Sequence, residues 1–354
     1  MNSRMFLRIT YGTGEWCNKN WMFIVKIRDH NSLYGKLKSS DQEFEDESNI
    51  FSIMSLKKNT SIVTIRTDSL IIKIQYENLM EMYDEDDLSK LSKDELASYL
   101  KSLKGLKDSI KKSGNPYQVK TYVPKLEERI SCIKQIQFVN KYISKTLLED
   151  MKFQYITEQH VEELKDICIK YNITTVERLR HFLVQCLAET GNDKDLIENG
   201  SKSYLEKQDY YPYYGAGRIQ ITWKYGYQAF AIHQALENCP QLSSKIKYPN
   251  PENNSPEIIE NMYNKMVKYA KEKNIDIKIY TDIVTIGPEY VAKNFAWESA
   301  GYFWEVNNCN DVVDSLGKNN TSGVDKITWI VNSRTDTYKE RRDSYDDVLS
   351  KYIK

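Results

Sequence analysis

The sequence has no net charge, no paired cysteine motif and no long hydrophobic run. Lys and Arg together number 50, and Asp and Glu together also number 50, so the formal net charge is zero. A balanced charge gives no reason to expect binding to nucleic acid or attraction to an anionic surface. The composition therefore predicts no nucleic-acid partner.

The cysteines lack the spacing of a metal site or of a disulfide framework. Six are scattered along the chain without a CxxC pair or a companion histidine cluster: Cys17, Cys132, Cys168, Cys186, Cys239 and Cys309. We expect no metal and no cofactor. Cys168 and Cys186 lie on apolar helical faces, which predicts small core residues.

The sequence contains no apolar segment that would direct the protein into or across a membrane. Residues 1–14 contain no stretch long enough for a signal peptide, and no later stretch is long enough to cross a bilayer. We expect synthesis in the cytoplasm without a signal peptide, and no membrane insertion.

At 354 residues the chain is long enough for two domains with separate cores. Residues 1–80 predict a small β-rich domain, because short runs of β-branched residues alternate with Gly, Asp, Asn and Ser. These runs are 5–10, 22–27, 61–66 and 70–76. Residues 81–151 predict a helical connector broken at 113–116, and residues 152–354 predict a mainly helical domain.

Glu189 ends a stretch with helical periodicity over residues 174–191. Thr174 and Glu177 have the spacing of a capping box, and Gly191 marks the helix end. Glu189 shares one edge of the apolar face, where desolvation favours a protonated carboxyl and suits a general acid. The alternative is a helix-terminal glutamate that points to water.

Three further motifs follow Glu189. They are Ile197-Glu198-Asn199-Gly200, Tyr214-Gly215-Ala216-Gly217-Arg218-Ile219-Gln220-Ile221-Thr222, and Ala296-Trp297-Glu298-Ser299-Ala300-Gly301. In this order the series resembles the catalytic domain of glycoside hydrolase family 19, which includes plant-type chitinases and bacteriophage lysins. The resemblance covers most of the second half of the chain and implies a mainly α, lysozyme-like fold.

The resemblance assigns the chemistry to two carboxylates. Glu189 matches the general acid, and Glu198 matches the second carboxylate of the lysin-type members, with Glu206 as the alternative base. An inverting glycosidase needs such a pair about 6.5–9.5 Å apart. The alternative for Glu198 is an acidic residue on a surface loop.

The resemblance also implies substrate contacts. Thr222 would hold the attacking water, and Gln220 would bind sugar hydroxyl or acetamido groups. Gly215 and Gly217 would let the backbone approach a sugar. Tyr214 and Tyr225 match the aromatic positions of the family.

Two residues near the C-terminus complete the implied site. Asn332 would bind substrate, and Arg341 would organise the carboxylates. The alternatives are an asparagine in a turn and an arginine on a helix surface. His160, His181 and His233 have no Ser or Cys partner motif, so a nucleophilic triad is not expected.

Three positions depart from the family pattern. Ala188 replaces a His that often precedes the acid, Ser333-Arg334 replaces a Gly pair, and Gly226 replaces a sugar-binding Asn of the chitinases. The Gly226 departure favours peptidoglycan over chitin as the substrate.

The sequence therefore predicts an endolysin-like enzyme of phage or prophage origin that cleaves β-1,4 bonds of peptidoglycan with inversion. It would reach the wall after holin-type release, lysis or delivery, and its N-terminal domain would bind the wall or a delivery or phage component. The alternatives are a chitinase, an inactive wall-binding or phage structural protein, and a delivered toxin effector.

Overall fold

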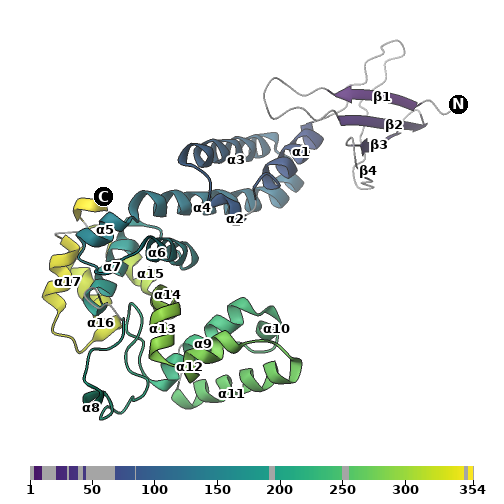
Figure 1. The fold of residues 1–354 in the computed structure, drawn as a ribbon. Coiled ribbons are helices and arrows are strands. Elements are labelled where there is room, and N and C mark those ends of the chain that lie inside the picture. The colour runs from purple at the N-terminus through teal and green to yellow at the C-terminus, as the bar shows by residue number, and fades with distance from the viewer. Residues whose placement is uncertain are drawn as a thin grey trace. The chain divides into compact units, whose positions relative to one another are not determined.

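The computed structural model describes residues 4–9, 21–29, 32–38, 43–44, 68–83, 85–190, 196–248, 255–346 and 350–353, and this part of the chain is mostly helical (Figure 1). The chain divides into two compact units. The N-terminal unit comprises Met1–Lys90 and Ala97–Ile130, and the C-terminal unit comprises Leu91–Leu96 and Ser131–Lys354. This division differs from the predicted boundaries at residues 80 and 151.

The strands of the N-terminal unit form one antiparallel sheet in the order β1-β2-β3-β4. Their bounds are β1 Arg4–Ile9, β2 Trp21–Asp29, β3 Ser32–Lys38 and β4 Glu43–Phe44. Phe6 pairs with Ile24 across β1 and β2, and Val25 pairs with Gly35 across β2 and β3. The strand predicted at 61–66 lies outside the described residues. Among the described residues of 1–80 the last strand ends at Phe44 and helix α1 begins at Asp68, so a β-rich domain extending to residue 80 is not seen there.

The strand predicted at 70–76 is wrong, because this segment belongs to helix α1, Asp68–Met80. Its apolar residues alternate, but Ile72 and Tyr76 are also four residues apart, which places them on one helical face. Both are buried, and the Tyr76 ring stacks on Tyr122 with centroids 4.4 Å apart. The sequence of residues 70–76 fits both the strand and the helix periodicity, and packing of Tyr76 against Tyr122 of α4 favours the helix.

Two long helices follow the short helix α2, Glu85–Leu88. They are α3, Lys93–Ser113, and α4, Pro116–Tyr142. Helix α3 begins with a capping box: the Glu95 N–H donates to Ser92 Oγ at 3.3 Å, and the Ser92 N–H donates to Glu95 Oε2 at 2.8 Å. The predicted break at 113–116 is also present, as a two-residue connection between the helices.

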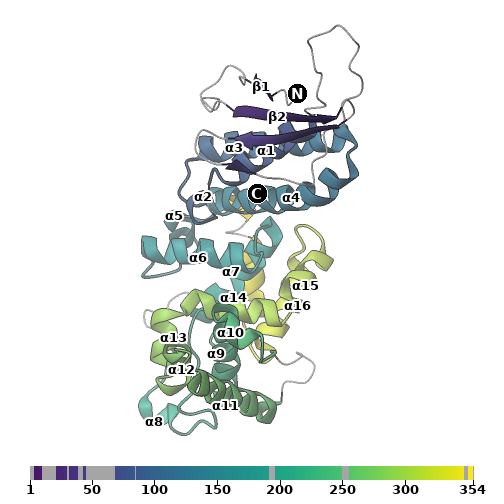
Figure 2. The ribbon, with the colours of Figure 1, turned by 90° about the vertical axis from the view of Figure 1, so that its right-hand side faces the viewer.

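The C-terminal unit is built from short helices around one core. They are α5 Lys145–Asp150, α6 Glu158–Lys170, α7 Val176–Thr190, α8 Lys202–Leu205, α9 Lys224–Asn238, α10 Pro240–Ser243, α11 Pro256–Lys273, α12 Lys278–Thr285, α13 Pro288–Asn294, α14 Ala296–Val306, α15 Cys309–Leu316, α16 Val324–Asn332, α17 Tyr338–Ser344 and α18 Ser350–Tyr352. Helices α15, α16 and α17 pack on α7, whereas α10, α11 and α12 pack on α9 (Figures 1 and 2).

Helix α14 packs against both α6 and α9. The buried residues of α6 are Val161, Leu164, Ile167 and Cys168, so the prediction of Cys168 as a core residue is confirmed. Gly301 of α14 lies so close to α6 that an added Cβ would be 2.2 Å from the Tyr171 ring. Cys186 is also buried in the core, as predicted.

One predicted helix start needs correction. The cap of α7 is Thr175, whose Oγ1 accepts from the Arg178 N–H at 3.3 Å, and not the predicted Thr174. Pro288 begins the separate helix α13, and the helix containing Trp297 begins at Ala296. Among the described residues, none of the helices combines the length and apolar character needed to cross a membrane.

Candidate functional site

Glu189 lies in the last turn of α7, and its side chain is 12% exposed. Arg341 of α17 is 2% exposed, and its Nη2 donates to Glu189 Oε1 at 2.6 Å. The carboxylate therefore does not point freely to water, and the arginine does not lie on a helix surface. The expected burial of Glu189 is present, and a buried guanidinium lies against the carboxylate.

Arg341 donates to two further acceptors. Its Nη1 lies 2.6 Å from Gln185 Oε1, and its Nε lies 3.0 Å from Thr337 Oγ1. The Gln185 amide in turn donates to Thr328 Oγ1 at 3.2 Å. A planar guanidinium bonded on three sides has a fixed orientation, so this buried network holds the Glu189 carboxylate in place.

Glu198 is attached to Gly215 through both its main chain and its side chain. The Glu198 N–H donates to the Gly215 carbonyl at 2.8 Å, and the Gly215 N–H donates to Glu198 Oε2 at 3.0 Å. The Tyr210 hydroxyl donates to Glu198 Oε1 at 2.5 Å. Burial and the adjacent carboxylate raise the pKa of the Tyr210 hydroxyl, so it stays a donor. Glu198 is therefore a positioned carboxylate and not a free residue on a surface loop.

The glycines of the second motif form a tight turn in which Ala216 bridges to Ile221. Gly217 has φ +78°, and an added Cβ would lie 2.1 Å from Ser299 Oγ of α14. An added Cβ at Gly215 would lie 2.5 Å from Gln220 Oε1. Packing inside the protein thus accounts for both glycines. Their predicted role in approaching a sugar stays a prediction.

Gln220 stabilises the same turn from within. Its φ is +55°, and its Nε2 donates to the Gly217 carbonyl at 3.0 Å and to the Leu196 carbonyl at 3.3 Å. Since an amide nitrogen has two hydrogens, both are directed at the main chain. These contacts favour a structural role for Gln220 over its predicted role as a donor to sugar.

Thr222 follows the turn and is partly exposed. Its hydroxyl donates to the Gln220 carbonyl at 2.9 Å. A hydroxyl has one hydrogen and two lone pairs, so in this arrangement Thr222 can accept a hydrogen bond from a water molecule.

An aromatic group lies beside Thr222. Trp223 and Tyr225 stack with centroids 6.2 Å apart, and Tyr210 meets the Trp223 ring edge-on at 5.6 Å. Trp223 is 40% exposed and Tyr225 is 38% exposed. Sequence reasoning missed Trp223 and Tyr210 as site residues, although Trp223 directly follows the motif 214–222 and Tyr210 precedes it by four residues.

Tyr214 connects the turn to two other elements. Its hydroxyl donates to Glu289 Oε1 of α13 at 2.5 Å, and its carbonyl accepts from the Tyr227 hydroxyl of α9 at 2.6 Å. Burial and the Glu289 carboxylate raise the pKa of the Tyr214 hydroxyl. These contacts position Tyr214, and its contact with a substrate stays a prediction.

Asn332 and Glu206 are the other two candidates. Asn332 is the last residue of α16, is half-buried, and accepts a hydrogen bond through its carbonyl from the Thr335 N–H at 3.3 Å. Glu206 ends the short helix α8, is exposed, and lies 3.8 Å from Lys202. Glu206 has none of the positioning bonds that Glu198 has, so the contacts favour Glu198 as the second carboxylate.

The turn that holds Glu198 also contacts the end of α7. Thr190, next to Glu189, has its Oγ1 3.4 Å from the Arg218 carbonyl and 3.2 Å from the Cys186 carbonyl, and the single hydroxyl hydrogen is shared between these two acceptors. The Arg218 N–H donates to the Ala296 carbonyl at 2.9 Å, and its guanidinium lies 4.8 Å from the centroid of the Trp297 ring. The three motifs found in the sequence are therefore adjacent in space, with the turn at 215–221 between them.

Comparisons with known proteins add no relative. A scan against protein-family models, a search of curated proteins and a search of solved structures each found no match. The resemblance to glycoside hydrolase family 19 accordingly rests on the spaced motifs of the sequence.

Proposed function

We propose that the C-terminal unit is an inverting glycoside hydrolase that cleaves β-1,4 bonds of peptidoglycan without a cofactor. The observation that carries this proposal is the contact of one turn, residues 215–221, with both acid-bearing segments. It holds Glu198 directly through Gly215, and it meets the end of α7 at Thr190 beside Glu189. Two positioned carboxylates are what glycosidic hydrolysis requires.

The contacts suggest a role for each oxygen. Arg341 contacts Oε1 of Glu189, so we assign Oε2 to proton donation to the leaving-group oxygen. Glu198 would remove a proton from the attacking water on the opposite face of the sugar. The other hydrogen of that water would be donated to Thr222 Oγ1, whose own hydrogen is directed at the Gln220 carbonyl.

The exposed aromatic rings support a sugar substrate. Trp223 and Tyr225 offer stacked, partly exposed faces next to Thr222. Such rings combine an apolar face with a polar edge, as a sugar ring does. Gly226, which replaces the Asn of chitinase-type members, favours peptidoglycan over chitin. A lysozyme-like fold, with Tyr214 and Asn332 as substrate contacts, belongs to the same proposal.

The proposal is tested by the release of reducing ends from purified peptidoglycan. Glu189→Gln and Glu198→Gln are each expected to lower the rate at least about a hundredfold, because each removes one proton-transfer group. Glu206→Gln tests the alternative base, and Glu260→Gln, an exposed partner of Lys224, is the matched control. Full activity in Glu189→Gln would overturn the proposal. The anomer formed first, followed by NMR, distinguishes inversion from retention.

A second candidate is a wall-binding protein without catalysis. The exposed Trp223 and Tyr225 would serve binding even if no bond were broken. Wild-type protein that sediments with peptidoglycan but releases no reducing ends would support this candidate, which includes a phage structural protein. Activity on chitin oligomers alone would instead indicate a chitinase.

Action on the wall would require release after lysis, holin-type export or delivery as a toxin effector. The N-terminal unit would then bind the wall or a delivery or phage component.

A further inference from the structure

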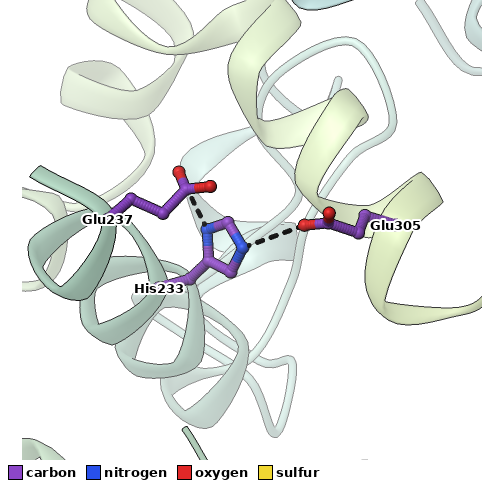
Figure 3. A group of neighbouring side chains, drawn as sticks. All are labelled: His233, Glu237 and Glu305. Atoms are coloured by element: carbon purple, nitrogen blue, oxygen red, sulfur yellow. Dashed lines mark hydrogen bonds and ion pairs between the residues drawn. The ribbon is translucent and has the colours of Figure 1, made fainter. Parts of the chain in front are cut away.

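A second group of polar side chains lies between α9 and α14 and takes no part in the proposed hydrolysis. Figure 3 shows the His233 imidazole between two carboxylates, with Glu237 on the same helix and Glu305 on another. His233 Nε2 lies 3.1 Å from Glu305 Oε2, and Nδ1 lies 3.5 Å from Glu237 Oε2. His233 and Glu237 are four residues apart on α9, so they share one face of that helix.

We propose that His233, Glu237 and Glu305 bind one divalent transition-metal ion of the zinc class and thereby join α9 to α14. One ligand atom from each side chain lies within 4.8 Å of the other two. Zinc bonds to His nitrogen and carboxylate oxygen are about 2.0–2.2 Å long, so in a tetrahedral site two of its ligands stand about 3.3–3.6 Å apart. Rotations of the Glu237 and Glu305 side chains that bring the donor atoms about 1.2–1.5 Å closer together would place all three on one ion.

The imidazole is already oriented for this role. Its side chain is 11% exposed, and its ring lies 4.9 Å from the Tyr302 ring and 5.8 Å from the Tyr248 ring. The two tyrosine hydroxyls are 2.6 Å apart. Within the described part of the chain, His233 Nδ1 is buried and makes no hydrogen bond. Packing therefore holds the ring while leaving a buried nitrogen for a ligand.

The local charge also favours a cation. Lys170 of α6 lies 2.6 Å from Glu237 Oε2 and 2.6 Å from Glu298 Oε1. Glu237 and Glu298 thus share one ammonium group, and Glu305 lies beside the imidazole, so these three carboxylates and Lys170 carry a formal charge of −2. A divalent ion would balance this charge. Glu237 is 33% exposed and Glu305 is 52% exposed, which gives the ion a path from solvent.

Replacing Lys170 tests whether zinc binds at Glu237 or elsewhere on the surface. Its ammonium occupies the oxygen of Glu237 that faces the imidazole, so it competes with a metal ion. Glu298 also accepts from the Tyr171 hydroxyl at 2.5 Å and from the Gln234 amide at 2.7 Å, so it keeps partners when Lys170 is replaced. We expect Lys170→Met to bind zinc several-fold more tightly than wild type.

The experiment titrates Zn²⁺ into the full chain by calorimetry, without substrate. We expect one ion per chain, a loss of at least tenfold in affinity in His233→Gln and Glu305→Gln, and no change in Glu260→Gln. Lys165→Met, on the same helix as Lys170 and paired with Glu162, is the control for loss of positive charge. Melting curves without zinc check that each variant is folded.

Two results would overturn the proposal. One is the absence of zinc binding in wild type, and the other is equal binding in wild type and Glu305→Gln. The inference does not use Glu189 or Glu198, and binding is measured without hydrolysis. Failure of either proposal is therefore distinguishable from failure of the other.

Discussion

Arg341 and Glu189 form an ion pair, with Nη2 and Oε1 2.6 Å apart, in which the arginine is 2% exposed and the glutamate 12% exposed. Two such charges depend on each other, because neither has enough water to replace its partner. The pair also joins the last turn of α7 to α17, so it is part of both the proposed site and the packing.

Removing Arg341 should destabilise the protein strongly. In Arg341→Met the Glu189 carboxylate stays mostly buried without a cation, which typically costs about 3–5 kcal/mol. Urea unfolding at neutral pH measures the change. The double variant Glu189→Gln/Arg341→Met should be more stable than Arg341→Met alone. Equal unfolding free energies of Arg341→Met and the double variant would show that the Glu189 charge does not need Arg341 as its partner.

The turn at 215–221 should tolerate no side chain at Gly217. Gly217→Ala places a Cβ at φ +78° and 2.1 Å from Ser299 Oγ, so we expect a loss of about 3 kcal/mol. Gly226→Ala is the matched substitution, because nothing lies within 4 Å of its added Cβ. In α9 it should gain about 0.5–1 kcal/mol from reduced chain entropy. Similar free energies of unfolding for the two variants would contradict this account.

His181 should make stability depend on pH. Burial lowers its pKa from the ordinary 6.5 to about 4, and neither ring nitrogen has a hydrogen-bond partner among the described residues. Between these values the unfolded chain binds a proton that the folded chain does not. Stability therefore falls as pH decreases from 6.5 to about 4, by up to about 3 kcal/mol, and this group adds no further loss below that.

The control for this pH effect is His181→Leu, which has similar volume and no titrating group. The difference in unfolding free energy between wild type and His181→Leu should change across pH 4 to 6.5 and be constant above it. A difference that is independent of pH in that range would show that His181 does not titrate as described.

Trp223 should contribute to substrate binding without contributing much to stability. Trp223→Ala removes a ring that is 40% exposed and stacked on Tyr225, and we expect about a tenfold loss in affinity for peptidoglycan fragments. Trp329→Ala, which removes a ring 67% exposed on α16, is the control. Equal losses in the two variants would indicate nonspecific contact with the wall.

Helices with a single apolar stripe could be predicted from the sequence, and those whose ends depend on neighbours could not. The stripe of α6 and the bounds of α11 follow from periodicity and capping residues. In contrast, Ile72 and Tyr76 satisfy strand and helix patterns alike, and their packing against Tyr122 decides. Helix α12, which the sequence analysis did not identify, has only eight residues.

Some residues of the candidate site could likewise be predicted from the sequence, and others could not. The motifs gave Glu189, Glu198 and Arg341 as candidates, and the structure places each in a network of bonds. Sequence reasoning could not find Gln185 or Tyr210, because their importance comes from contacts with Arg341 and Glu198 and not from any spacing. It also missed the group of His233, Glu237 and Glu305, because Glu305 lies 68 residues beyond Glu237 along the chain and only the fold brings it beside His233.

Two hydrogen bonds join Glu198 to Gly215, so the position of the Glu198 carboxylate is set by the turn at 215–221. It does not depend on the number of residues between Glu189 and Glu198. Main-chain and side-chain bonds both act on the same glycine, so the carboxylate moves only when the turn moves. Related sequences could therefore differ in the number of residues between the two acids and still present them in the same relation. Natural variation in that spacing would be neutral, whereas variation within residues 215–221 would not.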